Sequence, residues 1–374
     1  MGFRVRLVWA TDDFRVGGLS YPGFPILLDR DMRSVESACD FLIYHCLSRG
    51  RVQSEKSWRP YGQAMYDYFG FLEARNLDYR DCLYDNNHSI VATYRDWSIR
   101  QGLSPTTVNY RLRLILQFYR YAFQVGWVSR VPYDIDEVIV PRRKDFYAHF
   151  RKSAPTRGTP SVLMRETRPL LRLLSMDQIR SLMEGTMHHP TLNLILRLEI
   201  QTGLRKEEAL SFPASSVINP AHDRRTLIPV ELNPREMSVK GDRARRIDVP
   251  WSLMDRLWQY KLHERQARLD QSGTMECKPL FITRFGHPYS VNSQSINAQI
   301  KRHLGFVYQH MLRHSYATYT LISMKQHMDV GNALMYLRDR LGHASVTTTE
   351  IYLHYVDMIE DRVLAAFQEE IDRL

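Results

Sequence analysis

The sequence predicts a mainly α-helical protein with a small antiparallel β-sheet, built as an N-terminal helical bundle followed by an α+β domain. Apolar residues recur at helical spacing through the first third of the chain and again through most of its second half. Residues 226–249 instead carry short strand-like runs around a Gly-Asp turn. Between the two helical regions, residues 141–173 are rich in Arg and Pro and lack sustained periodicity.

The composition is that of a globular protein with more than one core. A chain of 374 residues is long enough for two domains. No run of about 18 apolar residues occurs, so we expect no membrane span. Asp12 and Asp13 interrupt the first apolar stretch, so we expect no signal peptide and a location in the cytoplasm. The four cysteines lack Cys-x-x-Cys spacing, which favours free thiols over disulfides or a zinc site.

The charge of the chain indicates an anionic partner. Its net charge is +10, with a pI of about 9.4. From Arg100 to Leu173 there are fourteen Lys and Arg residues against five Asp and Glu, so nearly all of the excess lies in one stretch. Such a concentration of positive charge predicts contact with nucleic acid.

The first 140 residues divide into an arm and a bundle. Residues 1–30 consist of short pieces broken by glycines and prolines, and we expect them to form a separate N-terminal arm. Residues 31–140 contain four segments with helical apolar spacing, which predict a compact bundle. The fourth segment starts after Ser104-Pro105, an N-cap followed by proline at the first helical position.

Polar and basic residues on the fourth predicted helix have two interpretations. They are Asn109, Tyr110, Arg111, Arg113 and Arg120. A solvated helix face is the ordinary explanation, and a face laid on the DNA backbone is the functional one. The segment that follows, residues 141–173, favours DNA binding and is interpreted as an exposed basic linker. Its most basic run is Arg142, Arg143 and Lys144.

Residues 174–374 form the second predicted domain. Ser175 has the pattern of an N-cap, with Gln178 three residues later. The apolar run 192–200 predicts a helix that ends at Gly203. Residues 226–249 predict the antiparallel sheet, with Lys240 at a strand end, and the rest is predicted to be helical.

Six residues of this domain have side chains suited to metal-free phosphodiester chemistry. They are Arg205, Lys240, His310, Arg313, His343 and Tyr352. Each arginine can fork two N–H groups onto one phosphate, and a tyrosine hydroxyl is a competent nucleophile once its proton is removed. Taken singly, each of the six residues has an ordinary explanation. Most tyrosines on amphipathic helices, for example, lie in a core. Their joint occurrence favours a site, whereas a zinc pair at His310 and His314 is disfavoured because Met311 replaces the required Glu.

Three segments resemble the tyrosine recombinase (phage integrase) family: residues 202–210, residues 310–318 and residues 341–345 with Tyr352. The resemblance covers residues 35–374, weakly in the first half. It implies a helical core-binding (SAM-like) bundle and an α+β catalytic domain that together enclose DNA. It also implies that the six residues above form the active site, with neither a metal nor another cofactor.

The resemblance assigns roles to these residues. Tyr352 would form a 3′-phosphotyrosyl link, and the freed 5′-hydroxyl would rejoin to a partner strand through a Holliday junction. Lys240 would protonate the departing 5′ oxygen. His310 and His343 would donate to phosphoryl oxygens or relay the tyrosine proton. Glu208 is expected to orient Arg205 through an i,i+3 contact, and His314 to be a supporting or packing residue.

The C-terminal tail predicts assembly. Residues 353–374 carry six acidic against two basic residues and an apolar stripe, which suits a neighbouring subunit better than DNA. Related recombinases use their C-terminal helix in this way, so the resemblance implies a tetramer on DNA through this segment, and folding back onto its own domain is the alternative. Accessory proteins remain open as further partners.

The expected function is site-specific recombination in integration or transposition of a mobile element. Two alternatives remain open. One is a type IB topoisomerase-like activity, which would relax supercoils without exchanging partners. The other is a DNA-binding regulator that has kept the fold and lost turnover.

Overall fold

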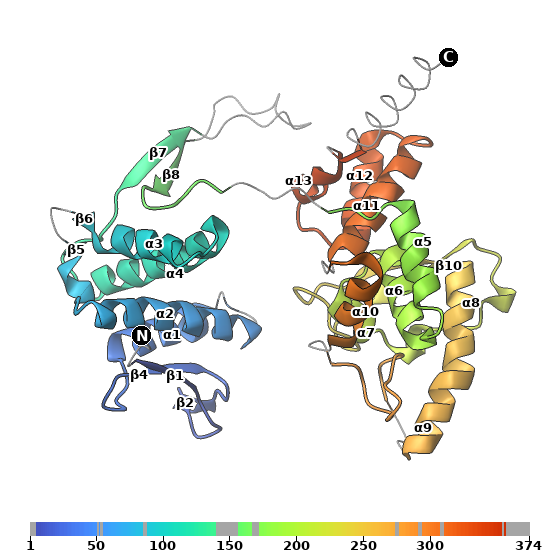
Figure 1. Ribbon diagram of the computed structural model, residues 1–374, viewed down its shortest axis with the longest axis horizontal. Coiled ribbons are helices and arrows are strands. Elements are labelled where there is room, and N and C mark those ends of the chain that lie inside the picture. The colour runs from blue at the N-terminus through green and yellow to red at the C-terminus, as the bar shows by residue number, and fades with distance from the viewer. Residues whose placement is uncertain are drawn as a thin grey trace. The chain divides into compact units, whose positions relative to one another are not determined.

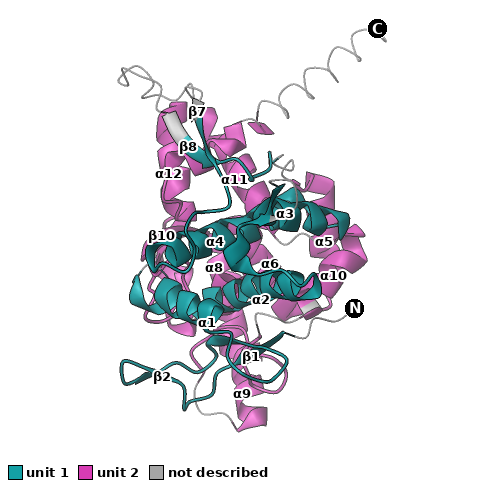
Figure 2. Ribbon diagram, turned by 90° about the vertical axis from the view of Figure 1, so that its left-hand side faces the viewer, with its two compact units in different colours: residues 1–168 teal, residues 169–374 magenta. Residues whose placement is uncertain are grey.

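The computed structural model describes residues 5–50, 52, 55–84, 88–139, 156–166, 172–273, 277–290, 294–306, 310–353 and 355–356. The chain forms two compact units, residues 1–168 (unit 1) and residues 169–374 (unit 2), shown in Figures 1 and 2. The predicted fold class, mainly helical with small antiparallel sheets, is confirmed. Within the described residues, no helix has the length and apolar character needed to cross a membrane.

Unit 1 contains the four predicted helices. They are α1 (Glu36–Ile43), α2 (Trp58–Ala74), α3 (Ile90–Arg100) and α4 (Pro105–Gln124). As the sequence predicts, α4 begins with Ser104 as N-cap, and its side chain accepts a hydrogen bond from the backbone N–H of Thr107. A π-helical turn at Tyr44–Ser48 extends α1. Short antiparallel pairs complete the unit: β1 (Arg6–Trp9) with β4 (Pro25–Leu28), β2 (Arg15–Val16) with β3 (Leu19–Ser20), β5 (Leu83–Tyr84) with β6 (His88–Ser89), and β7 (Ile135–Ile139) with β8 (Thr156–Pro160).

The expected N-terminal arm is part of this unit from residue 5 onward. Strands β1 and β4 pair with Arg6 opposite Leu28. Phe24 and Leu27 are buried in the same cluster as the helices. The backbone of α2 approaches this hairpin so closely that a Cβ at Gly62 would lie 2.4 Å from the Cβ of Pro25. The glycines and prolines of this segment therefore mark the turns of strands packed on α2, and residues 5–28 are not a free arm.

Part of the expected linker also belongs to unit 1. Strand β8 pairs with β7, with Ile135 opposite Pro160. The Asn109 side chain then binds the chain that follows β8: it donates to the Met164 carbonyl and to Glu166 Oε1, both at 2.8 Å, and accepts from the Met164 N–H at 2.9 Å. Residues 156–166 are therefore not an exposed linker. Arg142, Arg143 and Lys144 lie outside the described residues.

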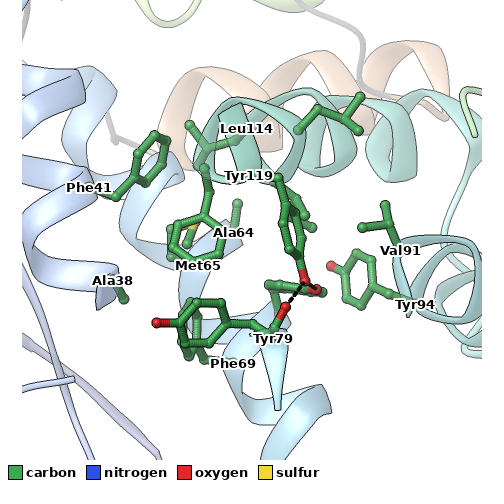
Figure 3. Close-up of a cluster of buried hydrophobic side chains, with 14 of the residues drawn as sticks. Ala38, Phe41, Ala64, Met65, Phe69, Tyr79, Val91, Tyr94, Leu114 and Tyr119 are labelled. Carbon is green, nitrogen blue, oxygen red and sulfur yellow. Dashed lines mark hydrogen bonds between the residues drawn. The ribbon is translucent and has the colours of Figure 1, made fainter. Parts of the chain in front are cut away.

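The core of unit 1 is rich in aromatic side chains, some of which also form buried hydrogen bonds. Tyr68, Tyr94 and Tyr119 are all fully buried, along with Phe41 and Phe118. The Tyr119 hydroxyl donates to the Tyr79 carbonyl at 3.1 Å, in the region shown in Figure 3. Because a hydroxyl has one proton, the 2.6 Å contact between the Tyr68 and Tyr119 hydroxyls has Tyr68 as donor. The core thus depends on polar pairing as well as on apolar burial.

Unit 2 consists of helices around one hairpin. The helices are α5 (Met176–Gly185), α6 (Pro190–Thr202), α7 (Lys206–Leu210), α8 (Trp251–Tyr260), α9 (Gln266–Ser272), α10 (Gln294–Leu304), α11 (His310–Lys325), α12 (Val330–Leu341) and α13 (Val346–Thr349). The predicted cap of α5 is present, because Ser175 and Gln178 form a capping box. Most residues of α6 are buried, and this helix packs against α8, α11 and the hairpin.

The hairpin differs from its prediction at one point. Strands β9 (Leu227–Leu232) and β10 (Arg245–Pro250) pair antiparallel, with Leu232 opposite Arg245. Residues 237–240 are not a strand, although Met237 and Val239 are buried. Lys240 is therefore exposed in the loop between the strands, and the expected position at a strand end is wrong.

The tyrosine hydrogen bonds of unit 1 lead to a test of core stability. We expect Tyr119→Phe to lower the free energy of unfolding by on the order of 2 kcal/mol, because it removes the Tyr119 hydrogen bond to the Tyr79 carbonyl and leaves the Tyr68 hydroxyl without its acceptor. Tyr68→Phe should cost less, since Tyr119 still donates to Tyr79. Urea unfolding of the two single variants and the double variant measures this order. A larger loss from Tyr68→Phe than from Tyr119→Phe would contradict the assigned donors.

Candidate active site

The six candidate residues come from several elements and loops of unit 2, and two of them share helix α11. Arg205 is the N-cap of α7 and follows Gly203, which ends α6 with φ of 68°. His310 and Arg313 lie in the first turn of α11, and His343 directly follows Gly342, which ends α12. Tyr352 lies in a helical turn after α13. Glycine is required at residue 203, because a Cβ there would lie 2.4 Å from the Tyr316 ring.

Arg313 is buried and binds the ends of two helices. Its side chain donates from Nη1 to the Gly203 carbonyl at 2.6 Å and from Nη2 to the Leu341 carbonyl at 2.5 Å. These carbonyls belong to the C-terminal ends of α6 and α12, whose partial negative charge stabilises a cation. Burial and the neighbouring Arg205 lower the pKa of Arg313 to about 9, so the side chain is charged at neutral pH. Both terminal nitrogens of Arg313 already donate to a carbonyl. Only the remaining N–H groups of Arg313 are therefore available for the expected two-pronged contact with a phosphate.

Arg205 is held by Glu208, as the i,i+3 expectation requires. Its Nη1 donates to Glu208 Oε1 at 3.0 Å, and its backbone N–H donates to Oε2 at 2.9 Å. Glu208 is 1% exposed and also accepts two hydrogen bonds from Arg245. Burial alone would raise the pKa of the Glu208 carboxyl, but the hydrogen bonds and charges of Arg245 and Arg205 outweigh burial and hold this pKa at about 2. Glu208 is thus an ionised anchor.

His343 is neutral and is oriented by two partners. Its Nε2 lies 3.3 Å from Arg313 Nη2, and its Nδ1 lies 3.0 Å from the Thr349 hydroxyl oxygen. Because a guanidinium only donates, Nε2 is the acceptor and the ring proton is assigned to Nδ1. Burial, followed by the positive charges of Arg313 and Arg205, lowers the pKa of His343 to about 3. In this arrangement Nε2 is occupied by Arg313 and does not take a proton from Tyr352.

The contact made by the Tyr352 hydroxyl was not foreseen from the sequence. Tyr352 is 2% exposed, and its hydroxyl oxygen lies 3.0 Å from His314 Nδ1. The Tyr352 ring stacks on the His343 ring, with centroids 6.4 Å apart. Burial, with the charges of His310 and Arg313, lowers the pKa of His314 to about 4, so a neutral imidazole faces the hydroxyl. His314 is therefore more than a packing residue, and its position one helical turn after His310 is the signal that could have revealed it.

Lys240 and His310 are the exposed members of the set. Partial desolvation of the ring and the positive charges of Arg313, Arg205 and Lys240 lower the pKa of His310. The two residues thus lie at the solvent side of a site whose inner members are Arg313, His343 and Tyr352. Among the residues that the structure describes, no group of three or more His, Cys, Asp or Glu side chains could hold a metal ion.

The candidate DNA-binding residues of α4 point in different directions. Asn109 is buried and binds residues 164–166, and Arg111 pairs with Asp67, which also accepts from the Tyr94 hydroxyl at 2.7 Å. These two residues act in the structure of unit 1. Tyr110 is 42% exposed, Arg113 pairs with Glu166 at 2.6 Å, and Arg120 donates to the Tyr133 hydroxyl at 3.1 Å.

The exposed part of this set continues into a basic hollow. Arg113 and Arg120 line a surface hollow of about 630 Å³ in unit 1. Arg49 lines the same hollow, although it comes from the segment after α1 and was not singled out in the sequence. The stacked rings of Tyr44 and Tyr121, with centroids 4.5 Å apart, also contribute to its lining. A face with three arginines and two tyrosines agrees with the nucleic-acid character inferred from charge.

Comparisons with known proteins agree with this geometry. A sequence profile described as "Phage integrase family" matches residues 172–358. The chain is 27% identical to the tyrosine recombinase XerD of Caulobacter vibrioides, over 81% of this chain and 87% of that protein. It is 23% identical to the tyrosine recombinase XerC of Chlorobaculum parvum, over 82% of this chain and 87% of that protein.

The fold is shared with solved structures. One is the XerH site-specific recombinase bound to palindromic difH substrate in a post-cleavage complex, with a TM-score of 0.55, 17% identity and 88% of each chain covered. Another is the Tn1549 transposon integrase in complex with transposon right end DNA, with a TM-score of 0.55 and 16% identity, covering 88% of this chain and 99% of that chain.

The neutral histidines predict how unit 2 responds to acid. The pKa of His314 falls from 6.5 to about 4 on folding, so between these values the unfolded chain binds a proton that the folded chain does not. Stability should therefore fall as pH drops from about 6.5 towards about 4. His314→Gln keeps an acceptor for Tyr352 but cannot titrate, and we expect it to lose less stability between pH 7 and pH 5. His343 contributes with the same sign, so the loss is reduced and not abolished. Melting curves at the two pH values measure the difference, and an unchanged pH dependence would contradict it.

Proposed function

Because this chain belongs to the phage integrase family, we propose that Tyr352 attacks a DNA phosphate and forms a 3′-phosphotyrosyl bond. The protein is a tyrosine recombinase, an enzyme that breaks and rejoins DNA. One observation carries the assignment of residues: segments far apart in the sequence meet at the Tyr352 side chain. Tyr352 contacts His314 of α11 and stacks on His343, which in turn contacts Arg313.

The positive charges of the site support the chemical step. A phosphate attacked by Tyr352 gains negative charge in the transition state, and Arg205 and Arg313 are proposed to supply the fixed donors that stabilise it. His314 Nδ1 takes the phenolic proton as the Tyr352 oxygen bonds to phosphorus. The 5′ oxygen leaves and takes a proton from Lys240. Reversal of these transfers rejoins the strand, so neither a nucleotide nor a metal is consumed.

In this proposal the DNA phosphate makes the neutral histidines basic enough to accept the tyrosine proton. A base with a pKa of about 4 accepts a proton from tyrosine poorly. An anion placed beside His314 and His310 favours their protonated forms and so raises both pKa values. Since Tyr352 is 2% exposed, its segment must shift for the hydroxyl to reach a phosphate. Both requirements couple activation of the tyrosine to DNA binding.

DNA binding is proposed to use the exposed candidate residues of unit 1. In unit 1 these are Tyr110, Arg113 and Arg120, continued by Arg142, Arg143 and Lys144, which lie outside the described residues. Contacts of this kind bind phosphates and position the protein without reading the base sequence. Asn109 and Arg111 leave the proposed interface because their side chains bind other parts of unit 1.

The biological role that we propose is integration or transposition of a mobile element. The fold shared with the Tn1549 transposon integrase agrees with this role. The XerC and XerD relatives favour a second candidate, Xer-type chromosome resolution. Mapping the cleaved DNA separates the two: cleavage at both ends of a segment that is recovered as a circle supports the mobile element, and cleavage at one fixed chromosomal site supports the Xer-type role.

The covalent intermediate gives the first prediction of function. Incubation with nicked suicide duplexes from the DNA that flanks the gene should give a denaturation-resistant adduct with the native protein and none with Tyr352→Phe, which lacks the nucleophilic oxygen. Tyr355→Phe removes a hydroxyl from the same segment and should keep the adduct. Binding of a verified site without an adduct from the native protein would support the regulator alternative. Relaxation of supercoils without recombinant products would support the topoisomerase-like alternative.

Assembly gives a second prediction. We propose that the C-terminal helix docks on a neighbouring subunit and builds a tetramer on DNA; this helix lies outside the described residues. Deletion of residues 363–374 should then leave DNA binding by single subunits but abolish the tetramer, because the apolar stripe that buries against the neighbour is lost. Analytical ultracentrifugation on a DNA duplex measures the assembly. An intact tetramer after the deletion would contradict docking of this segment on a neighbouring subunit.

A further inference from the structure

The side chain of Arg245 is largely buried, and the residue lies outside the three short motif segments, residues 202–210, 310–318 and 341–345. It begins β10, and its side chain is 7% exposed. Its two terminal nitrogens fork onto the Glu208 carboxylate, Nη1 to Oε1 at 3.0 Å and Nη2 to Oε2 at 2.6 Å. Its Nε donates to the Arg340 carbonyl at 3.1 Å. Planar, two-pronged arginine–carboxylate pairs of this kind fix orientation as well as charge.

The two oxygens that Arg245 binds are the same two that hold Arg205. Oε1 accepts from Arg205 Nη1, and Oε2 accepts from the Arg205 backbone N–H. Glu208 therefore lies between two arginines, one at the phosphate-binding side and one at the hairpin. A carboxylate held from one side only can rotate about its side-chain bonds, whereas the fork from Arg245 fixes its plane. The position of the Arg205 guanidinium thus depends on Arg245.

The end of α12 connects this arrangement to the rest of the site. Arg245 donates a hydrogen bond to the Arg340 carbonyl, and Arg313 donates one to the carbonyl of the next residue, Leu341. Two arginines thus bind consecutive carbonyls at the helix end that directly precedes His343. The Arg245 stem passes over Gly342, where a Cβ would lie 2.8 Å from its Cδ. Because both ends of the Arg245 side chain are anchored, the side chain could not move aside for a Cβ at residue 342. Glycine is therefore required at this position by the contact as well as by its φ of 65°.

We propose that Arg245 is a positioning residue for DNA cleavage, which holds Arg205 through Glu208 in register with Arg313 and His343. This proposal rests on the proposed function of the site. Arg245 does not itself bind the phosphate, because its Nε and both terminal nitrogens face protein acceptors. Its contribution is to the geometry of Arg205, and a displacement of about 1 Å in a group that stabilises a transition state can slow a reaction by about 100-fold.

The test is the rate of adduct formation at saturating DNA, with the suicide duplex that the native protein cleaves. We expect Arg245→Ala to be slower by about 100-fold with DNA affinity retained. Arg245→Lys keeps the charge but cannot fork onto Glu208 and reach Arg340, so it should not restore the rate. Arg246→Ala removes a charge from the next position of β10, where the side chain is 57% exposed, and should stay within about twofold of the native rate.

A double variant separates action through Arg205 from a general effect on folding. If Arg245 acts through Arg205, Arg205→Ala with Arg245→Ala should be no more than about twofold slower than Arg205→Ala alone. A full additional loss in the double variant, or a native rate in Arg245→Lys, would overturn the proposal. So would a native rate at saturating DNA in Arg245→Ala with only its melting temperature lowered. Absence of any adduct from the native protein would overturn the proposed function and this proposal with it.

A further variant covers failure to fold, because removal of one partner from a buried ion pair is strongly destabilising. Replacement of both partners, Glu208→Gln with Arg245→Gln, leaves neither position 208 nor position 245 with an unpaired buried charge. We expect this protein to fold, as measured by its melting temperature, and to cleave slowly because Arg205 has lost its anchor. Native cleavage by this variant would overturn the proposal.

Discussion

The site of unit 2 depends on a single buried cation bound to two helix ends. Arg313 joins the last turns of α6 and α12 through the Gly203 and Leu341 carbonyls. The residues that follow these ends are Arg205, after α6, and His343, after α12, so one guanidinium sets the spacing of both. Helix ends leave carbonyls without partners, and a buried cation needs acceptors, so each satisfies the other. The glycine at each helix end lets the chain turn sharply into the site residue that follows.

The same concentration of positive charge determines the protonation of its neighbours. His310, His314 and His343 all have lowered pKa values, because burial and the nearby arginines disfavour a further cation. Glu208 provides the compensating negative charge and stays ionised. Because Arg205, Arg313 and Lys240 carry more positive charge than Glu208 compensates, the site is suited to bind a further anion. A DNA phosphate would both neutralise the arginines and make the histidines more basic, so binding and activation share one electrostatic cause.

Unit 1 shows where local patterns give reliable structure and where they do not. The spacing of apolar residues and the Ser104-Pro105 start predicted α4 correctly, because helix periodicity and capping are local properties. The patterns at residues 5–28 and 156–166 contained turns and single strands, which are stable only against other elements. Their burial on α2, β7 and Asn109 depends on contacts between residues far apart in the sequence. Interleaved polar residues on α4 likewise could not be divided into structural and exposed ones without knowing which faces are covered.

The sequence by itself determined the helical bundle, the α+β second unit and the family, and it offered a candidate set of side chains for the chemistry, because periodicity, caps and short motifs are carried by neighbouring residues. Only the tertiary structure decided which partners those side chains have. It placed His314 on the Tyr352 hydroxyl, tied His343 to Arg313 and put Arg245 behind Glu208. These contacts join residues between 30 and 38 positions apart, and nothing in a local pattern records such a distance. One arginine among several in the run 243–246 becomes distinct only when β10 pairs with β9 and turns its side chain towards α7 and α12.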